Sequence, residues 1–178
     1  MTDDQTKLFA EAFERYNDEL FRHCSLRLSD RERALDLTQE AFLRTWDYLS
    51  KGGVVREFRP FLYRTLKNLI IDEYRKKKTF SLEALSEGDE GQEINAHMPV
   101  DETNTLEAAI DRFDGKRALS ALTQLPDPYR EVLVMRYVDG LSPGEIAEAL
   151  GESENAVSVR VHRGLKKLQT LLEPGDTL

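Results

Sequence analysis

The side chains with the clearest chemical use are polar and basic residues spaced along one predicted helix near the carboxyl end. Residues 155–170 contain four Lys or Arg and no Asp or Glu. Arginine can donate two hydrogen bonds to guanine, and basic side chains bind phosphates, so the pattern favours DNA contact. The polar face of this helix is predicted to present Glu154, Asn155, Ser158, Arg160, His162, Arg163, Lys166 and Lys167.

The stretch 142–163, SPGEIAEALGESENAVSVRVHR, is predicted to position that face as the second helix of a helix-turn-helix. Ser142 and Glu145 have the spacing of a capping box, and Pro143 fits the first helical position. Gly151 suits the turn, and Ser153 can cap the second helix. The buried stripe is predicted to hold Val157, Val161, Leu165, Leu168 and Leu172. An amphipathic hairpin with a solvated basic face would give the same pattern, so the motif alone leaves both interpretations open.

Composition favours a helix-rich protein without a membrane span. The chain has 178 residues, 40% hydrophobic and 33% charged, and no apolar run of about 18 residues. The first residues are acidic and polar, unlike a signal peptide. Cys24 is the one cysteine, so no internal disulfide can form, and we expect a buried thiol in a reducing cytoplasm.

Net charge argues against DNA binding, but the charge is unevenly distributed. The total is −8, yet residues 79–115 hold 10 acidic groups and 1 basic group. Residues 1–78 hold 16 basic and 14 acidic groups. Within this range, residues 56–78 hold 8 basic and 3 acidic groups. Contact with phosphates depends on such local patches, because salt screens charges beyond about 8–10 Å.

The predicted fold is all-α, with two small helical domains, 1–78 and 113–178, joined by a flexible acidic linker, 79–112. The linker has few large apolar residues with which to form a core. It is interpreted either as a solubilising tether or as an acidic segment that competes with DNA for the basic faces.

Three or more helices are predicted in the first domain, the second beginning after Ser29 and Asp30 and the third running from about 59 to 78. An apolar face of the first helix is predicted to comprise Leu8, Phe9, Ala12, Phe13, Tyr16, Leu20, Phe21 and Cys24. In the second helix, the residues predicted to face inward are Ala34, Leu37, Ala41 and Thr45. In the second domain, the helix-turn-helix should be supported by Leu119, Leu122, Leu125, Val132, Leu133 and Met135.

Three motifs in this order resemble the sigma factors of bacterial RNA polymerase, in the short two-domain form of the extracytoplasmic-function (ECF) group. DLTQEAFLRTW is similar to the polymerase-binding helix of region 2. FRPFLYRTLKNLIIDEYRKKK is similar to the helix that melts the promoter and reads its −10 element. LPDPYREVLVMRYVDGLSPGEIAEALGESENAVSVRVHRGLKKL is similar to region 4, which reads the −35 element.

The resemblance implies roles for individual residues. Contact with polymerase is implied for Asp36, Gln39, Glu40, Leu43 and Trp46. Trp46 is interpreted either as an interface anchor or as part of the domain core. Cations and aromatic rings suited to holding an unpaired −10 strand are Lys51, Arg56, Phe58, Arg59, Phe61, Tyr63, Arg64, Lys67 and Asn68. The resemblance also implies that Arg130 contacts the DNA backbone near the −35 element. Arg130 could equally be a solvated charge on a helix surface.

Two positions depart from the family's common form, and both bear on base preference. Ser158 stands where a lysine is usual, which shifts more of the −35 contact to Arg160 and Arg163, and Phe61 stands where tryptophan is frequent. The implied partners are core RNA polymerase (its β and β′ subunits), promoter DNA and an anti-sigma protein, with no membrane insertion.

Enzymatic readings find little support in the sequence. The three histidines lie far apart, no Cys/His spacing indicates a metal, and no glycine-rich phosphate loop is present. We therefore expect no catalytic residue, metal or cofactor. Two alternatives remain: a helix-turn-helix regulator that acts without polymerase, and a protein-binding module that sequesters a regulator.

Overall fold

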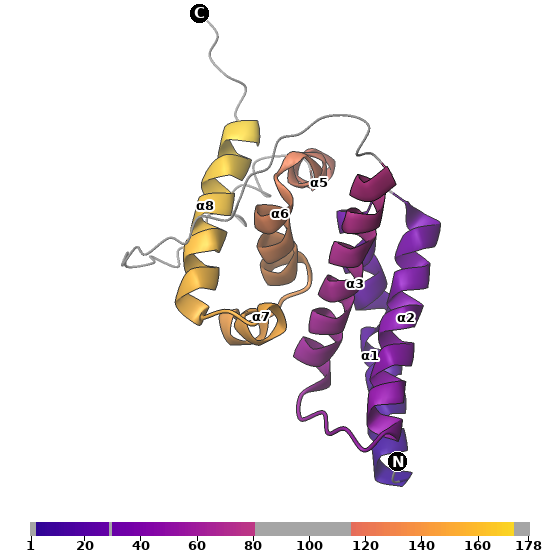
Figure 1. Ribbon diagram of the computed structural model, residues 1–178. Helices are drawn as coiled ribbons and strands as arrows, with labels where there is room; N and C mark the ends of the chain where they lie inside the picture. Colours follow the sequence, from indigo (N-terminus) through magenta and orange to yellow (C-terminus); the bar gives the residue numbers. More distant parts are fainter. Residues whose placement is uncertain (1–2, 29, 81–114, 173–178) are drawn as a thin grey trace, which may run out of the picture. The chain divides into compact units, whose positions relative to one another are not determined.

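The computed structural model describes residues 3–28, 30–80 and 115–172, and over these residues the protein is all-α, as predicted (Figure 1). The elements are α1 (Asp3–Arg27), α2 (Arg31–Ser50), α3 (Phe58–Phe80), α5 (Gly115–Gln124), α6 (Asp127–Leu133), the π-helix η1 (Val134–Val138), α7 (Pro143–Leu150) and α8 (Glu154–Leu172). None of the described helices is both long and apolar enough to span a membrane.

The described helices group into two compact units. Helices α1 to α3 lie in the first, and α5, α6, η1, α8 and most of α7 lie in the second. The predicted linker 79–112 lies outside the described residues except for its first two, which complete α3. The domain boundaries therefore remain predictions.

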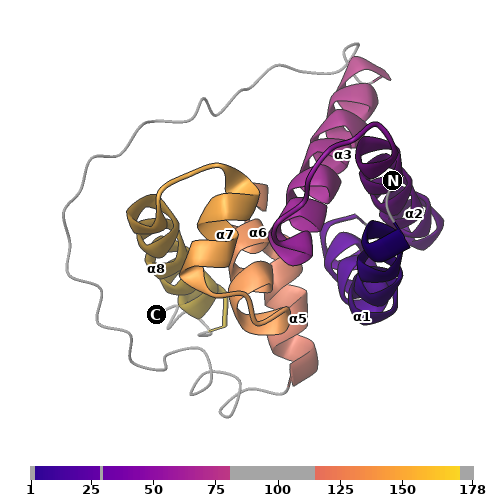
Figure 2. The same ribbon diagram turned by 90° about the horizontal axis from the view of Figure 1, so that it is seen from below.

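In the first unit, α1, α2 and α3 pack against one another in pairs (Figures 1 and 2). Each contributes an apolar stripe at three- and four-residue spacing, and burying such stripes is what holds short helices together in water. The predicted inward residues of α2, Ala34, Leu37, Ala41 and Thr45, are all buried, which confirms that stripe. The largest buried aliphatic side chains of the unit are Leu20, Leu49, Leu62, Leu66 and Ile70.

Helix α1 is buried only in part. Leu20 and Cys24 are fully buried, but Leu8 and Phe13, two other residues of the predicted apolar face, are 48% and 44% exposed. Phe13 lies edge-on against Phe42 of α2, with ring centroids 4.9 Å apart, which covers only one side of its ring. Burial raises the pKa of the Cys24 thiol to about 12, so the thiol stays protonated and unreactive near neutral pH.

The core of the second unit combines α5, the end of α6 and α8. Leu119 is 44% exposed, so its predicted supporting role was wrong. Helix α5 buries positions 118, 121 and 122, the stripe of a helix, and Leu125 directly after it is also buried, whereas position 119 falls outside the stripe. The core residues are Ala121, Leu122, Leu125, Leu133, Leu168 and Leu172.

The helix-turn-helix has the local bonds expected from its sequence. The Ser142 amide donates to Glu145 Oε2 (2.8 Å), and the Glu145 amide donates to Ser142 Oγ (3.2 Å), which confirms the capping box. Gly151 has φ +70°, a conformation that favours glycine. Ser153 Oγ accepts from the Ala156 amide at 3.2 Å, so the predicted cap of α8 is confirmed.

Helix α6 continues into a wider turn, η1, that the sequence did not predict. The Asp139 amide donates to the carbonyl of Val134 at 2.9 Å, five residues back instead of four. A π-turn of this kind accommodates one extra residue within a helical path. It ends at Val138, and Gly140, which has φ +69°, lies between it and the start of α7.

Helix α8 approaches α6 closely at Gly164. A Cβ atom added there would lie 3.2 Å from Cδ1 and Cγ of Leu133 and 3.4 Å from Cβ of Tyr129. The glycine therefore lets the second helix of the motif pack tightly on α6.

Gly164→Leu should lower the free energy of unfolding of the second unit by about 1–3 kcal/mol, because the added side chain overpacks the contact with Leu133. Thermal unfolding followed by circular dichroism measures the change. Thr170→Leu, an exposed position on the same helix, is the matched control and should change stability by less than about 0.5 kcal/mol. Equal stability of the two variants would contradict the close approach.

Candidate functional site

One outward face of α2 carries all five residues predicted to contact polymerase. Positions 36, 39, 40 and 43 have i, i+3, i+4 and i+7 spacing, and position 46 follows three residues later, so they share one side of the helix. Leu43 is 63% exposed and Trp46 is 37% exposed. Exposed apolar side chains among charged neighbours are typical of a protein-binding surface.

Trp46 combines the two roles that the sequence left open. Its ring lies edge-on against Phe9 of α1, with centroids 5.0 Å apart, and Phe9 also meets Phe42 at 6.2 Å. More than a third of the residue nevertheless remains exposed. Trp46 therefore supports the packing of α1 on α2 and also contributes to the outward face.

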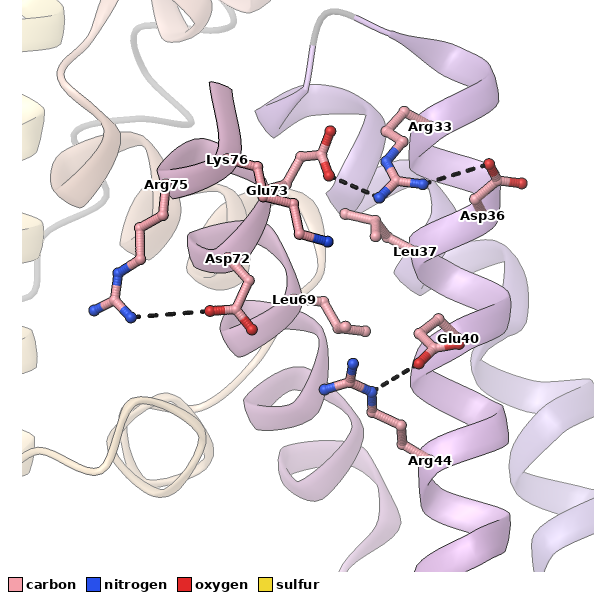
Figure 3. Close-up of a pocket in the computed structure, with 10 residues that line it drawn as sticks. All are labelled: Arg33, Asp36, Leu37, Glu40, Arg44, Leu69, Asp72, Glu73, Arg75 and Lys76. Carbon is pink, nitrogen blue, oxygen red and sulfur yellow. Dashed lines mark hydrogen bonds and ion pairs between the residues drawn. The ribbon is translucent and has the colours of Figure 1, made fainter. Parts of the chain in front are cut away.

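A cleft of about 510 Å³ lies between α2 and α3, beside this face (Figure 3). Arg33 donates from Nη2 to Glu73 of α3 at 2.8 Å, and its Nη1 lies 3.7 Å from Asp36. The hydrogen bond with Glu73 is the main cause that raises the pKa of the Arg33 guanidinium. Glu40 pairs with Arg44 at 2.8 Å. Two predicted polymerase contacts, Asp36 and Glu40, therefore already have arginine partners on α2.

The predicted −10 residues divide into an exposed group and a group packed among neighbours. Arg56, Arg64, Asn68 and Lys51 are exposed, and Lys51 pairs with Asp47 at 2.6 Å. Phe58, Arg59, Phe61 and Lys67 are half-buried. The Phe61 ring lies 5.3 Å from the ring of Tyr48, so aromatic surface does lie beside the exposed cations.

Glu19 of α1 holds two of the predicted −10 residues against the core. Its Oε1 accepts from Arg59 Nε at 2.8 Å and from the Tyr63 hydroxyl at 2.9 Å. Tyr63 is 1% exposed, so its ring is not available to stack on a base and its predicted place on the DNA-binding surface is wrong. Position 63 belongs to the apolar stripe of α3, between Leu62 and Leu66, which explains the burial.

Helix α8 carries the predicted −35 residues other than Arg130, between positions 154 and 166. Glu154, Asn155, His162 and Lys166 are exposed, and Ser158, Arg160 and Arg163 are half-buried. Arg160 Nη2 donates to Oε2 of Glu152 at 2.7 Å, and both side chains are 27% exposed. The basic face of this helix is thus interrupted by one carboxylate from the turn.

Arg130 is tied to the protein backbone. Its Nη2 donates to the carbonyl of Leu125 at 2.8 Å, which joins α6 to the end of α5. The Arg130 side chain is half-buried. Joining the two helices is therefore at least part of its role.

Sequence reasoning missed the carboxylates Glu19, Glu73 and Glu152. Glu19 and Glu73 pair with arginines 40 positions away in the chain, so no local spacing indicates them. Glu152 is eight residues from Arg160 across a turn, a separation that no helix-spacing rule covers.

Comparison with known proteins points to one family for both units. The Sigma-70 region 2 family matches residues 12–80, and the Sigma-70 region 4 family matches residues 116–168. The ECF RNA polymerase sigma factor SigW of Bacillus subtilis is 33% identical over 165 residues, covering 92% of this chain and 88% of SigW. SigL of Mycobacterium tuberculosis, also named an ECF sigma factor, is 32% identical over 89% of this chain and 85% of its own length.

A solved structure has the same fold. The sigma factor RpoE of Bartonella quintana, determined in complex with the anti-sigma factor NepR, superposes with a TM-score of 0.68. The match covers 93% of this chain and 97% of RpoE at 20% sequence identity.

Glu19→Ala should lower the free energy of unfolding by about 1–3 kcal/mol, because it removes two hydrogen bonds between α1 and α3 that the Glu19 carboxylate accepts. Urea unfolding measures the loss. Glu14→Ala, an exposed carboxylate on the same helix, should change stability by less than about 0.5 kcal/mol. If both substitutions cost the same, Glu19 does not hold Arg59 and Tyr63 in solution.

Proposed function

This chain belongs to the sigma-70 family of RNA polymerase sigma factors, with relatives of the ECF group along almost its whole length, and we propose which of its surfaces perform each step of initiation. It is a transcription initiation factor that directs RNA polymerase to promoters. The observation that carries the assignment is the joint match of region 2 on α1–α3 and region 4 on α5–α8.

The outward face of α2 binds core polymerase in this proposal. The exposed side chain of Leu43 and the exposed part of Trp46 supply apolar contact area. Gln39 adds hydrogen-bonding capacity, and Asp36 and Glu40 bring negative charge to the same face. The partner surface should therefore combine apolar and basic side chains, since both would be satisfied at this face.

The exposed face of α3 holds the −10 element. Arg64 of α3 and Arg56, two residues before the helix, bind phosphates, and Asn68 offers an amide that can pair with a base edge. The half-buried ring of Phe61, beside Tyr48, supplies the stacking surface for an unpaired base. Arg59 contributes less to DNA binding, because its Nε already donates a hydrogen bond to Glu19.

Helix α8 reads the −35 element in the major groove. Arg160 and Arg163 are the candidates for guanine contacts, while Lys166 binds phosphate. Asn155 and Ser158 lie on the same half of the helix and add polar contacts. Recognition by two separate units then depends on how far apart the two elements lie in the promoter.

An inhibitory protein of the anti-sigma class is a further proposed partner. The support is that RpoE, which shares the fold, is described in complex with the anti-sigma factor NepR. No residue of the present chain identifies the inhibitor.

Run-off transcription tests the function. Core polymerase with this protein should start transcripts from fragments of the organism's own genome, and the protein alone should not. DNA binding and regulation without any dependence on core polymerase would instead favour the polymerase-independent regulator.

Leu43→Asp should weaken binding to core polymerase at least about tenfold, because it places a charge in the apolar centre of the α2 face. Fluorescence anisotropy of the labelled protein measures the affinity. The melting temperature should stay within about 2 °C, since the residue is 63% exposed.

Leu8→Asp is the matched control, an exposed leucine on α1 that should leave polymerase affinity unchanged. Unaltered affinity of Leu43→Asp would place the polymerase surface elsewhere. A large fall in its melting temperature would show that position 43 belongs to the core.

Asn68→Ala should slow promoter opening about 5- to 100-fold at unchanged polymerase affinity, because it removes a base-edge contact from the exposed face of α3. Permanganate reactivity of unpaired thymines in the −10 element reports opening. Tyr63→Phe is the control, since its ring is buried, and below its melting temperature it should open promoters normally. Loss of opening in Tyr63→Phe alone would reverse the assignment of these two residues.

A further inference from the structure

The ion pair between Glu152 and Arg160 joins the turn of the helix-turn-helix to the DNA-reading face of α8. We infer that Glu152 is a positioning residue that sets the base preference of Arg160 at the −35 element. The inference rests on the proposed −35 role of α8. Glu152 itself was not among the residues expected to contact DNA.

Backbone contacts hold the main chain of Glu152 in place. Its amide donates to the carbonyl of Ala147 at 3.0 Å, and the preceding Gly151 has the positive φ that turns the chain. The following Ser153 caps α8 through the Ala156 amide. The carboxylate therefore starts from a rigid point at the amino-terminal end of the reading helix.

The pair is more buried than the two ion pairs Glu40–Arg44 and Asp47–Lys51, which lie on the surface of α2 and at its end. Arg160 and Glu152 are both 27% exposed, and Nη2 and Oε2 are 2.7 Å apart. Arg44 and Glu40 are 53% and 43% exposed, and Lys51 and Asp47 are 74% and 61% exposed. A partly buried pair loses less of its attraction to solvent screening, so the guanidinium is held more firmly in one orientation.

An arginine held in this way can still read a base. The guanidinium has five N–H donors, and the hydrogen bond to Glu152 uses one of those on Nη2. The remaining donors can form a bidentate contact with guanine, whose geometry demands a fixed plane. Fixing that plane before binding removes side-chain freedom that would otherwise be lost in the complex.

Arg163 offers the internal contrast. It lies three residues along α8, and within the described part of the chain it has no acidic partner. An arginine without a fixed orientation suits a phosphate, which needs charge more than direction. Of the two candidates for guanine contacts, Arg160 therefore reads a base pair, and Arg163 contributes sequence-independent affinity.

A carboxylate near DNA also has a cost that makes the inference testable. Negative charge on the DNA-facing side weakens binding to every sequence through repulsion of phosphates. Removing Glu152 should therefore leave overall binding as strong or stronger while reducing discrimination at one base pair. Removing a residue that merely stabilised the fold would not lower discrimination at one base pair while leaving overall DNA affinity unchanged or higher.

The experiment uses the full chain with core polymerase and a set of promoters carrying every single-base change in the −35 element. The proteins are wild type, Glu152→Ala, Arg160→Ala, the double variant and Glu148→Ala. Glu148 is an exposed carboxylate of α7 and is the charge-matched control. Equilibrium binding gives the preference at each position, and melting temperatures confirm that each variant is folded.

At the −35 position that Arg160 contacts, the wild-type protein should prefer one base pair by about 5- to 150-fold. Arg160→Ala should abolish the preference at that position and leave the preferences at the other positions unchanged. Glu152→Ala should reduce the same preference at least about fivefold, the double variant should match Arg160→Ala, and Glu148→Ala should keep the wild-type profile.

Three outcomes would overturn the inference. An unchanged profile in Glu152→Ala makes the pair a surface contact only. A uniform gain in affinity with no change in preference makes Glu152 a general repulsive charge. A change at a base pair other than the one Arg160 reads means that Glu152 contacts DNA itself. A wild-type protein without any −35 preference would count against the proposed −35 role, which is a separate result.

Discussion

Every described helix of this protein is stabilised by burying one apolar stripe, and the placement of the functional side chains depends on that constraint. In proteins most helical stability comes from packing an amphipathic face, so each stripe has to meet a neighbour. In α2 the stripe at Ala34, Leu37, Ala41 and Thr45 leaves the opposite side for Leu43 and its polar neighbours. In α8 the stripe at 157, 161, 164, 168 and 172 likewise turns the polar residues toward solvent. Packing thus decides which residues can meet polymerase or DNA.

Carboxylates add a second level of control over the basic side chains. Glu19 binds Arg59, and Glu152 binds Arg160, each at less than 3 Å and each within the unit that carries the arginine. An unpaired cation would contribute mainly sequence-independent attraction to DNA, which a promoter-selective protein has reason to restrict. The acidic composition of the chain is therefore compatible with DNA recognition, because part of the negative charge orients the cations that remain exposed.

The sequence predicted the all-α fold, the helix-turn-helix with its caps, and the inward stripe of α2, because these depend on spacing within a few residues. It misplaced Leu119, whose burial depends on how far a neighbouring helix extends over it. It also misplaced Tyr63, since aromatic residues among arginines resemble a stacking surface until the helix packing is known. The pairings Glu19–Arg59 and Arg33–Glu73 join positions 40 residues apart, which no local pattern encodes. The polar contacts assigned to α2, α3 and α8 stay predictions. The structure brings the α2 set to one outward face, whereas the −10 set divides into exposed and packed residues.

The π-turn η1 has a consequence for how sequences of this kind can change length. One added or removed residue within an α-helix rotates everything beyond it by about 100°. At η1 the extra residue is absorbed in a single wide turn between Val134 and Asp139, before α7 begins. A deletion there would therefore change the rotational phase of the following helices relative to α6, even if every remaining side chain were kept. When region 4 segments are exchanged between relatives to alter promoter choice, the junction should accordingly preserve residue number through 134–139 as strictly as residue identity in α8.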